Sequence, residues 1–193
     1  MITALDAKTA LVVIDLQKGI LNKGKRAHPV DEILAKNAAL IAAFRKANLP
    51  IVIVTVNPAG AKWTFSRKEG SPANVSDVPA QLPEAFTQVV ATITTQPNDI
   101  FITKQTWNAF YNTPLHEELQ QREITGIVLS GVATSIGVEG TARAASELGY
   151  NITFAADAMT DGHLEAHERS LHYIFPRMGE VGTTTEILQH LPQ

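Results

Sequence analysis

Asp15, Lys104 and the turn at residues 131–137 have the types and positions that chemistry needs. Asp15 ends an apolar run at 9–14, and Lys104 follows a second run at 99–103. The carboxyl ends of parallel strands meet at one edge of a sheet, so we expect these groups to lie together. Such a set could move protons and hold an anion. The alternative is a buried ion pair that only orients loops.

The turn itself joins an apolar run at 124–129 to a helix expected over 135–148, which Gly149 ends. The first N–H groups of a helix have no partner within it, and the helix dipole favours negative charge there. This turn is therefore expected to hold an anion or a developing oxyanion.

Three other patterns point to different chemistry more weakly. His163 and His167 are four residues apart and could share a metal, but no third ligand is evident and a solvated helix face is favoured. Ser135 lacks the G-x-S-x-G pattern of a nucleophile elbow. The glycines at 131–140 have the wrong spacing for a dinucleotide-binding fingerprint.

Strands and helices alternate along the chain. We expect strands at 9–15, 51–56, 99–103, 124–129, 151–156 and 180–182, and helices at 31–48, 84–92, 113–121, 135–148, 162–175 and 184–190. This order predicts a three-layer α/β fold: a doubly wound sheet of about six mostly parallel strands with helices on both faces. One domain spanning 1–193 is expected.

The longest irregular stretch, 57–98, has the length of a lid or a binding loop. Trp63, Phe65 and Arg67 are its candidates for facing a substrate. A surface or interface position is an equal alternative for them.

Composition excludes several classes of protein. The 193 residues carry a net charge of −3 and no cysteine, which excludes disulfides and a thiol nucleophile. No basic face suggests nucleic acid, and the small cluster of Lys23, Lys25 and Arg26 favours a solvated edge over a phosphate site. No signal peptide or membrane-spanning stretch is apparent, so a cytoplasmic protein is expected.

Four motifs together resemble the isochorismatase-like hydrolases, also called cysteine hydrolases. They are VVIDLQ at 12–17, Lys104 followed by NAF at 108–110, GVAT at 131–134 and AADA at 155–158. The resemblance covers nearly the whole chain in order. It is specific for the fold and the superfamily, not for a substrate.

The resemblance implies a site of Asp, Lys and Cys, of which Asp15 and Lys104 match the first two. Gly137 occupies the position of the nucleophilic Cys. The family's cis peptide maps to Val132–Ala133, and its oxyanion hole maps to the N–H groups of Ala133 and Gly137.

The same motifs add Gln17, Asn108, Phe110, Val132 and Thr134 to the expected substrate-binding residues. Trp63 and Arg67 join them as candidates from the long stretch at 57–98. Some members carry a metal on an Asp-x-His motif, but 55–59 reads TVNPA here, so no metal and no cofactor are expected. Relatives of this kind are often dimers or larger, and a homo-oligomer is expected.

Without a thiol the chain cannot form a thioester. The resemblance leaves two enzymatic routes open: Asp15 as a general acid on an enol (vinyl) ether, as in true isochorismatases, or Asp15 as a general base that activates water at a labile C–N bond. A retired enzyme that binds a small molecule or a partner is the alternative. A purely structural role fits the placement of Asp15 and Lys104 poorly.

Overall fold

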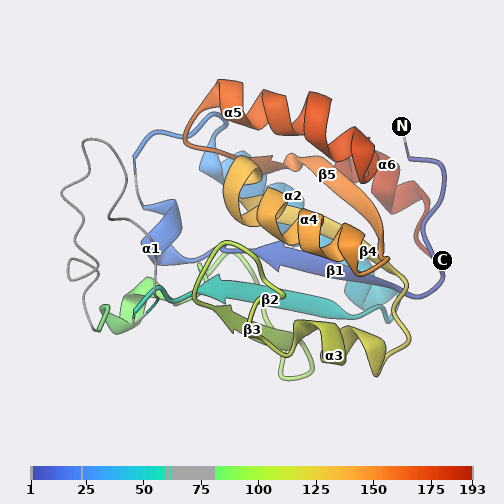
Figure 1. Ribbon diagram of the computed structural model, residues 1–193, viewed down its shortest axis with the longest axis horizontal. Coiled ribbons are helices and arrows are strands. Elements are labelled where there is room, and N and C mark those ends of the chain that lie inside the picture. Colours follow the sequence, from blue (N-terminus) through green and yellow to red (C-terminus); the bar gives the residue numbers. More distant parts are fainter. Residues whose placement is uncertain (1, 23, 60, 62–80, 193) are drawn as a thin grey trace.

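Six parallel strands form the centre of the computed structural model, which describes residues 2–22, 24–59, 61 and 81–192 (Figure 1). The strands are β1 Thr9–Ile14, β2 Ile51–Val56, β3 Ile100–Lys104, β4 Gly126–Val132, β5 Asn151–Thr160 and β6 Gly179–Gly182. Their order in the sheet is β3-β2-β1-β4-β5-β6, and every neighbouring pair is parallel. The expected doubly wound α/β fold is confirmed.

The helices are α1 Lys18–Leu21, α2 Val30–Lys46, α3 Leu115–Gln120, α4 Glu139–Glu147, α5 Leu164–Arg169 and α6 Thr184–Gln189. Shorter helical turns are η3 Glu84–Phe86, η4 Thr134–Val138, η5 Ser170–Ile174 and η6 Phe175–Arg177. Two expectations were wrong in detail. The stretch at 16–29, where no helix was expected, contains α1, and the helix expected over 84–92 is a single turn at η3.

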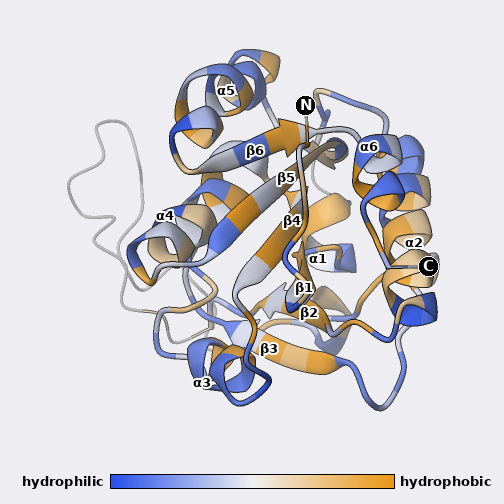
Figure 2. Ribbon diagram, turned by 90° about the vertical axis from the view of Figure 1, so that its right-hand side faces the viewer, coloured by the Kyte–Doolittle hydropathy of each residue, from blue (hydrophilic) through white to orange (hydrophobic). Residues whose placement is uncertain are grey.

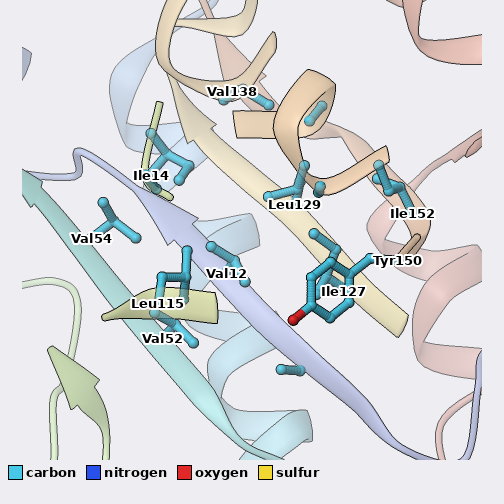
Figure 3. Packing of buried hydrophobic residues seen from close by; sticks show 14 of the residues in the cluster. Val12, Ile14, Val52, Val54, Leu115, Ile127, Leu129, Val138, Tyr150 and Ile152 are labelled. Carbon is cyan, nitrogen blue, oxygen red and sulfur yellow. The ribbon is translucent and has the colours of Figure 1, made fainter. Parts of the chain in front are cut away.

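Side chains of β1 alternate between two apolar cores, one on each face of the sheet. Val12 and Ile14 join the core under α3 and α4, where Leu115 and Val138 also lie (Figure 3). Leu11 and Val13 join the core under α2 and α6. Figure 2 shows the sheet between these two layers of helices. β1 is buried on both faces, as its unbroken apolar run predicts.

The order of strands reverses between β1 and β4, and ligands of doubly wound proteins bind at such a point. Ile14 at the tip of β1 pairs with Gly131 of β4. A Cβ on Gly131 would lie 2.1 Å from the Ile14 carbonyl oxygen, and its φ is +109°. Only glycine fits this close approach without strain.

Some element boundaries differ from expectation. α2 begins at Val30 and α3 at Leu115, with Pro29 and Pro114 at their N-cap positions, whereas the helices were expected from 31 and from 113. β5 continues beyond the expected 151–156 to Thr160, after a register shift in its pairing with β4. Among the described residues, every helix is too short or too polar to cross a bilayer.

Candidate active site

The side chains of Asp15 and Lys104 meet at the carboxyl ends of β1 and β3. Lys104 Nζ lies 2.8 Å from Asp15 Oδ2, and the two side chains are 1% and 7% exposed, respectively. Lys104 Nζ also donates to the Trp107 carbonyl at 2.9 Å. The second carboxyl oxygen, Asp15 Oδ1, is buried and has no hydrogen-bond partner. Lys104 therefore satisfies one carboxyl oxygen of Asp15 and leaves the other without a protein partner.

A sharp backbone turn aims the Asp15 side chain. Asp15 has φ 54°, in the left-handed region that Asp tolerates better than most residues. Its N–H donates to the Val54 carbonyl at 2.9 Å, and its carbonyl accepts from Gln17 N–H at 2.8 Å. These bonds fix the end of β1 against β2, so the position of the carboxyl group is set by the sheet.

Burial raises the pKa of the Asp15 carboxyl from 3.8 to about 6, although the charge and hydrogen bond of Lys104 act in the opposite direction. A carboxyl group with such a pKa holds its proton over part of the range near neutrality. It can therefore serve as a proton donor as well as a base.

Gly137 lies beside this pair on η4. A Cβ placed on it would be 3.3 Å from Asp15 Oδ2 and 3.1 Å from Ile14 Cγ2. The preceding Val132–Ala133 peptide bond is cis. The structure thus brings Asp15, Lys104 and the turn at 131–137 into one place.

A cavity of about 330 Å³ opens onto these groups. Its lining from the strand tips and the turn comprises Asp15, Lys104, Val132, Ala133, Ile136 and Gly137, and its lining from loops includes Ile20, Arg26, Val56, Phe86, Thr106 and Trp107. Other hollows on the molecule are of similar or larger volume but do not touch the Asp15–Lys104 pair. We assign the candidate site to this cavity because it alone among them joins space to a titratable pair.

Gln17 and Thr134 lie beside the cavity but are not part of its lining. Gln17 is fully buried, and its amide bonds to both N–H and C=O of Val56 and to the Phe86 carbonyl. Thr134 Oγ1 lies 2.8 Å from His167 Nδ1. Both side chains hold segments of the site in place.

Asn108 and Phe110 also lie outside the lining of the cavity. The Asn108 side chain accepts from Phe110 N–H at 2.8 Å, and the Phe110 ring stacks on Tyr150. Trp63, Phe65 and Arg67 fall outside the described residues.

The weaker candidates take up structural contacts. Ser135 donates through both N–H and Oγ to Asp161 Oδ2, each at 2.8 Å. Position 163 is the N-cap of α5, while His167 is buried against Thr134. Within the described ranges no group of three or more His, Asp or Glu side chains could hold a metal.

Arg26 is the residue that sequence reasoning missed. It was expected to be part of a solvated basic edge, yet it lines the cavity, and its Nε is buried. Lys25 beside it is exposed, as expected. Neither periodicity nor spacing separates these two positions, because both lie in a loop whose path depends on tertiary contacts.

The fold and the site define a doubly wound α/β protein with an acid–lysine pair at its topological switch point. The isochorismatase domain matches residues 9–186. The chain therefore belongs to the isochorismatase family of hydrolases.

Individual relatives agree with this assignment. YecD of Escherichia coli O157:H7, an isochorismatase family protein, is 40% identical over 190 residues, covering 97% of this chain and 98% of its own. The ureidoacrylate amidohydrolase RutB of Methylobacterium radiotolerans is 30% identical, covering 88% and 72%. The structure of an isochorismatase family protein from Burkholderia thailandensis superposes with a TM-score of 0.89 at 36% identity, covering 99% of both chains.

Proposed function

We propose that this protein hydrolyses an enol ether of a small metabolite without a covalent intermediate, with Asp15 as the general acid. The observation that carries the proposal is the Asp15 carboxyl group. It is buried, its pKa is raised to about 6, one of its oxygens has no hydrogen-bond partner, and the residue lines a cavity.

The reaction balances with water as the only co-reactant. Asp15 donates its proton to the terminal carbon of the C=C–O–R unit, and the positive charge develops on the carbon attached to the ether oxygen. Water adds to that carbon and returns a proton to Asp15. The hydroxyl proton of the resulting hemiketal passes to the ether oxygen as the C–OR bond breaks, which releases the alcohol R–OH and a ketone. General acid catalysis of this kind contributes about 10²- to 10⁴-fold in rate.

Lys104 has two tasks in this scheme. Its ammonium holds Asp15 in one orientation through the 2.8 Å contact, and it stabilises the carboxylate that proton donation leaves behind. The carboxylate then faces the cationic carbon, which further stabilises the charge that develops there.

The absence of cysteine separates this site from thioester chemistry. Gly137 stands where the family resemblance puts the thiol, so no side chain at this position lies beside Asp15 Oδ2. The same absence of a nucleophile supports a second candidate function, a retired enzyme that binds a small molecule in this cavity. A labile C–N bond, cleaved by water that ionised Asp15 activates, is the further enzymatic alternative.

A direct assay tests the proposal. The full chain is incubated with isochorismate as an enol ether and with nicotinamide as an amide, and products are followed by chromatography. Isochorismate turnover is expected, and Asp15→Asn is expected to remove at least about 99% of it, in line with the loss of a general acid. The control is Asp31→Asn, which makes the same change at an exposed position.

Equal turnover by Asp15→Asn and wild type would refute the assignment of Asp15. Turnover of the amide but not of the enol ether would favour the C–N alternative. Binding of isochorismate with no turnover of either compound would favour the retired enzyme.

A further inference from the structure

Arg26 brings a second cationic group to the cavity, from the loop that precedes α2. One guanidinium nitrogen, Nη2, donates to the Ile20 carbonyl, whereas Nε is buried and has no hydrogen-bond partner. Within the described part of the chain, no carboxylate forms an ion pair with Arg26. A donor of this charged group is therefore shielded from water and left unmatched by protein.

Asp161 is the acidic residue that influences Arg26, and its oxygens already have other partners. Oδ2 accepts from Ser135 N–H and Oγ, and Oδ1 accepts from the N–H groups of Gly162 and His163. Burial lowers the pKa of Arg26, while the charge of Asp161 acts in the opposite direction. Asp161 thus offsets part of the charge of Arg26 without filling its hydrogen-bonding positions.

The charge balance of the cavity favours an anion. Its charged lining consists of Asp15, Lys104 and Arg26 among the described residues. Asp15 and Lys104 neutralise each other at 2.8 Å, which leaves the charge of Arg26. Protonation of Asp15, which the general acid requires, makes the cavity more positive still. Partly buried charges are stable when they are paired, and a guanidinium pairs best with a planar carboxylate.

We propose that Arg26 binds a carboxylate of the substrate and so selects carboxylate-bearing enol ethers over neutral ones. The aromatic side chains of Phe86 and Trp107 line the same cavity and supply surface for a planar substrate. This inference rests on the proposed function for the use of the site. The binding of a carboxylate can nevertheless be measured without any turnover.

The first experiment compares benzoate with benzamide, two planar ligands of nearly equal size that differ in charge. Binding to the wild-type chain is followed by isothermal titration calorimetry at pH 7.5. Benzoate is expected to bind more tightly, and Arg26→Gln to weaken it by about 10- to 100-fold, the range for a charge-assisted hydrogen bond. Benzamide binding is expected to change little in the same variant.

The matched control is Lys25→Gln, which removes the same charge from the neighbouring exposed side chain. It is expected to leave benzoate binding within about twofold of wild type, since exposed charges interact weakly through water. Equal losses in the two variants, or equal binding of benzoate and benzamide by wild type, would overturn the proposal. The wild-type comparison still tests the preference of the cavity for a carboxylate if Arg26→Gln does not fold.

Asp15→Asn separates this inference from the proposed function. It is expected to abolish turnover of isochorismate while keeping or tightening benzoate binding, because it removes a negative charge from the cavity. Benzoate binding that depends on Arg26 in a protein without turnover would support the carboxylate site and refute the enzyme. Turnover of isochorismate with an unchanged KM in Arg26→Gln would support the proposed enzyme and refute the carboxylate site at Arg26.

Discussion

At the scale of single residues, the site depends on a competition within one carboxyl group. Burial raises the pKa of Asp15 and Lys104 lowers it, and burial has the larger effect. The side chain of Asp15 is only 7% exposed, so water does little to stabilise its charged form. The contact with Lys104 that orients Asp15 therefore does not prevent its carboxyl group from holding a proton.

The pH dependence of catalysis follows from this balance. If Asp15 donates the proton, kcat/KM for the enol ether is expected to fall about tenfold per pH unit above pH 6, the value to which its pKa is raised. Initial rates between pH 5 and pH 9 measure this. A rate that rises through pH 6 would show that the ionised carboxylate acts instead, as a base.

Lys104→Met is expected to destabilise the fold in a pH-dependent way. Breaking a buried ion pair costs about 3–5 kcal/mol when the remaining charge stays buried. Asp15 can take up a proton instead, so the loss should be larger at pH 8 than at pH 5. Urea unfolding of wild type and Lys104→Met at the two pH values measures this loss of stability.

Lys8→Met is the control for that experiment, because Lys8 pairs with Glu123 at the surface with side chains 58% and 81% exposed. It is expected to change stability by no more than about 1 kcal/mol at either pH. An equal loss of unfolding free energy in Lys104→Met at the two pH values would contradict the coupling between Lys104 and the protonation of Asp15.

Residues of the site differ in how far sequence could identify them. Asp15 and Lys104 stand at the ends of apolar runs, and strand ends have a defined place in this topology. Arg26 carries no such signal, because a loop residue faces the cavity only through contacts that sequence spacing does not record. Gln17 matches a motif, yet its amide is used by the backbone of β2 and η3.

At the scale of elements, β1 and β4 must approach closely for the site to exist. The run at 9–14 and the run at 124–129 predict both strands well, since apolar β-branched runs of this length are typical of buried strands. The extension of β5 to Thr160 was not predicted, because it follows a register shift that is decided by pairing with β4. Pairing across a sheet is a tertiary property.

Gly131→Ala tests whether β1 and β4 must lie this close together. A Cβ there would lie 2.1 Å from a backbone oxygen of β1 at a φ of +109°, so we expect a loss of more than about 3 kcal/mol in unfolding free energy. Gly149→Ala has a φ of +84° and open space, so it measures the conformational cost alone, about 1 kcal/mol. Similar losses in the two variants would show that the strands can move apart.

Gly137→Cys tests the turn on η4. The new Cβ would have contacts of 3.1 Å and 3.3 Å, so a loss of about 1 kcal/mol in stability is expected as neighbours shift. The chain has no other cysteine, so alkylation by iodoacetamide reports this thiol alone. We expect it to react and nicotinamide hydrolysis to rise above that of wild type.

The control places the same residue at an exposed glycine, Gly162→Cys, whose Cβ would meet nothing within 4 Å. Its thiol is expected to react without any gain in amide hydrolysis. A thiol at 137 that iodoacetamide cannot reach would contradict the position of the cavity.

At the scale of the whole molecule, Asp15 links proton binding to folding. Its pKa is about 6 when folded and near 3.8 when unfolded. The stability that protonated Asp15 contributes is therefore fully present below pH 3.8 and lost as pH rises through 6. A shift of this size corresponds to about 3 kcal/mol, at about 1.36 kcal/mol per unit.

Unfolding free energies of wild type and Asp15→Asn between pH 3 and pH 8 measure this linkage. The difference between the two proteins is expected to change by about 3 kcal/mol in favour of the variant as the pH rises. Parallel curves would mean that the Asp15 carboxyl group has an ordinary pKa in the folded protein.

The left-handed backbone at the end of β1 restricts what can replace Asp15. Asn and Gly adopt a φ near 54° readily, whereas β-branched residues do so only with strain. Asp15→Asn therefore removes the acid while keeping the backbone of this turn, whereas a β-branched residue at position 15 would disturb the end of β1 itself.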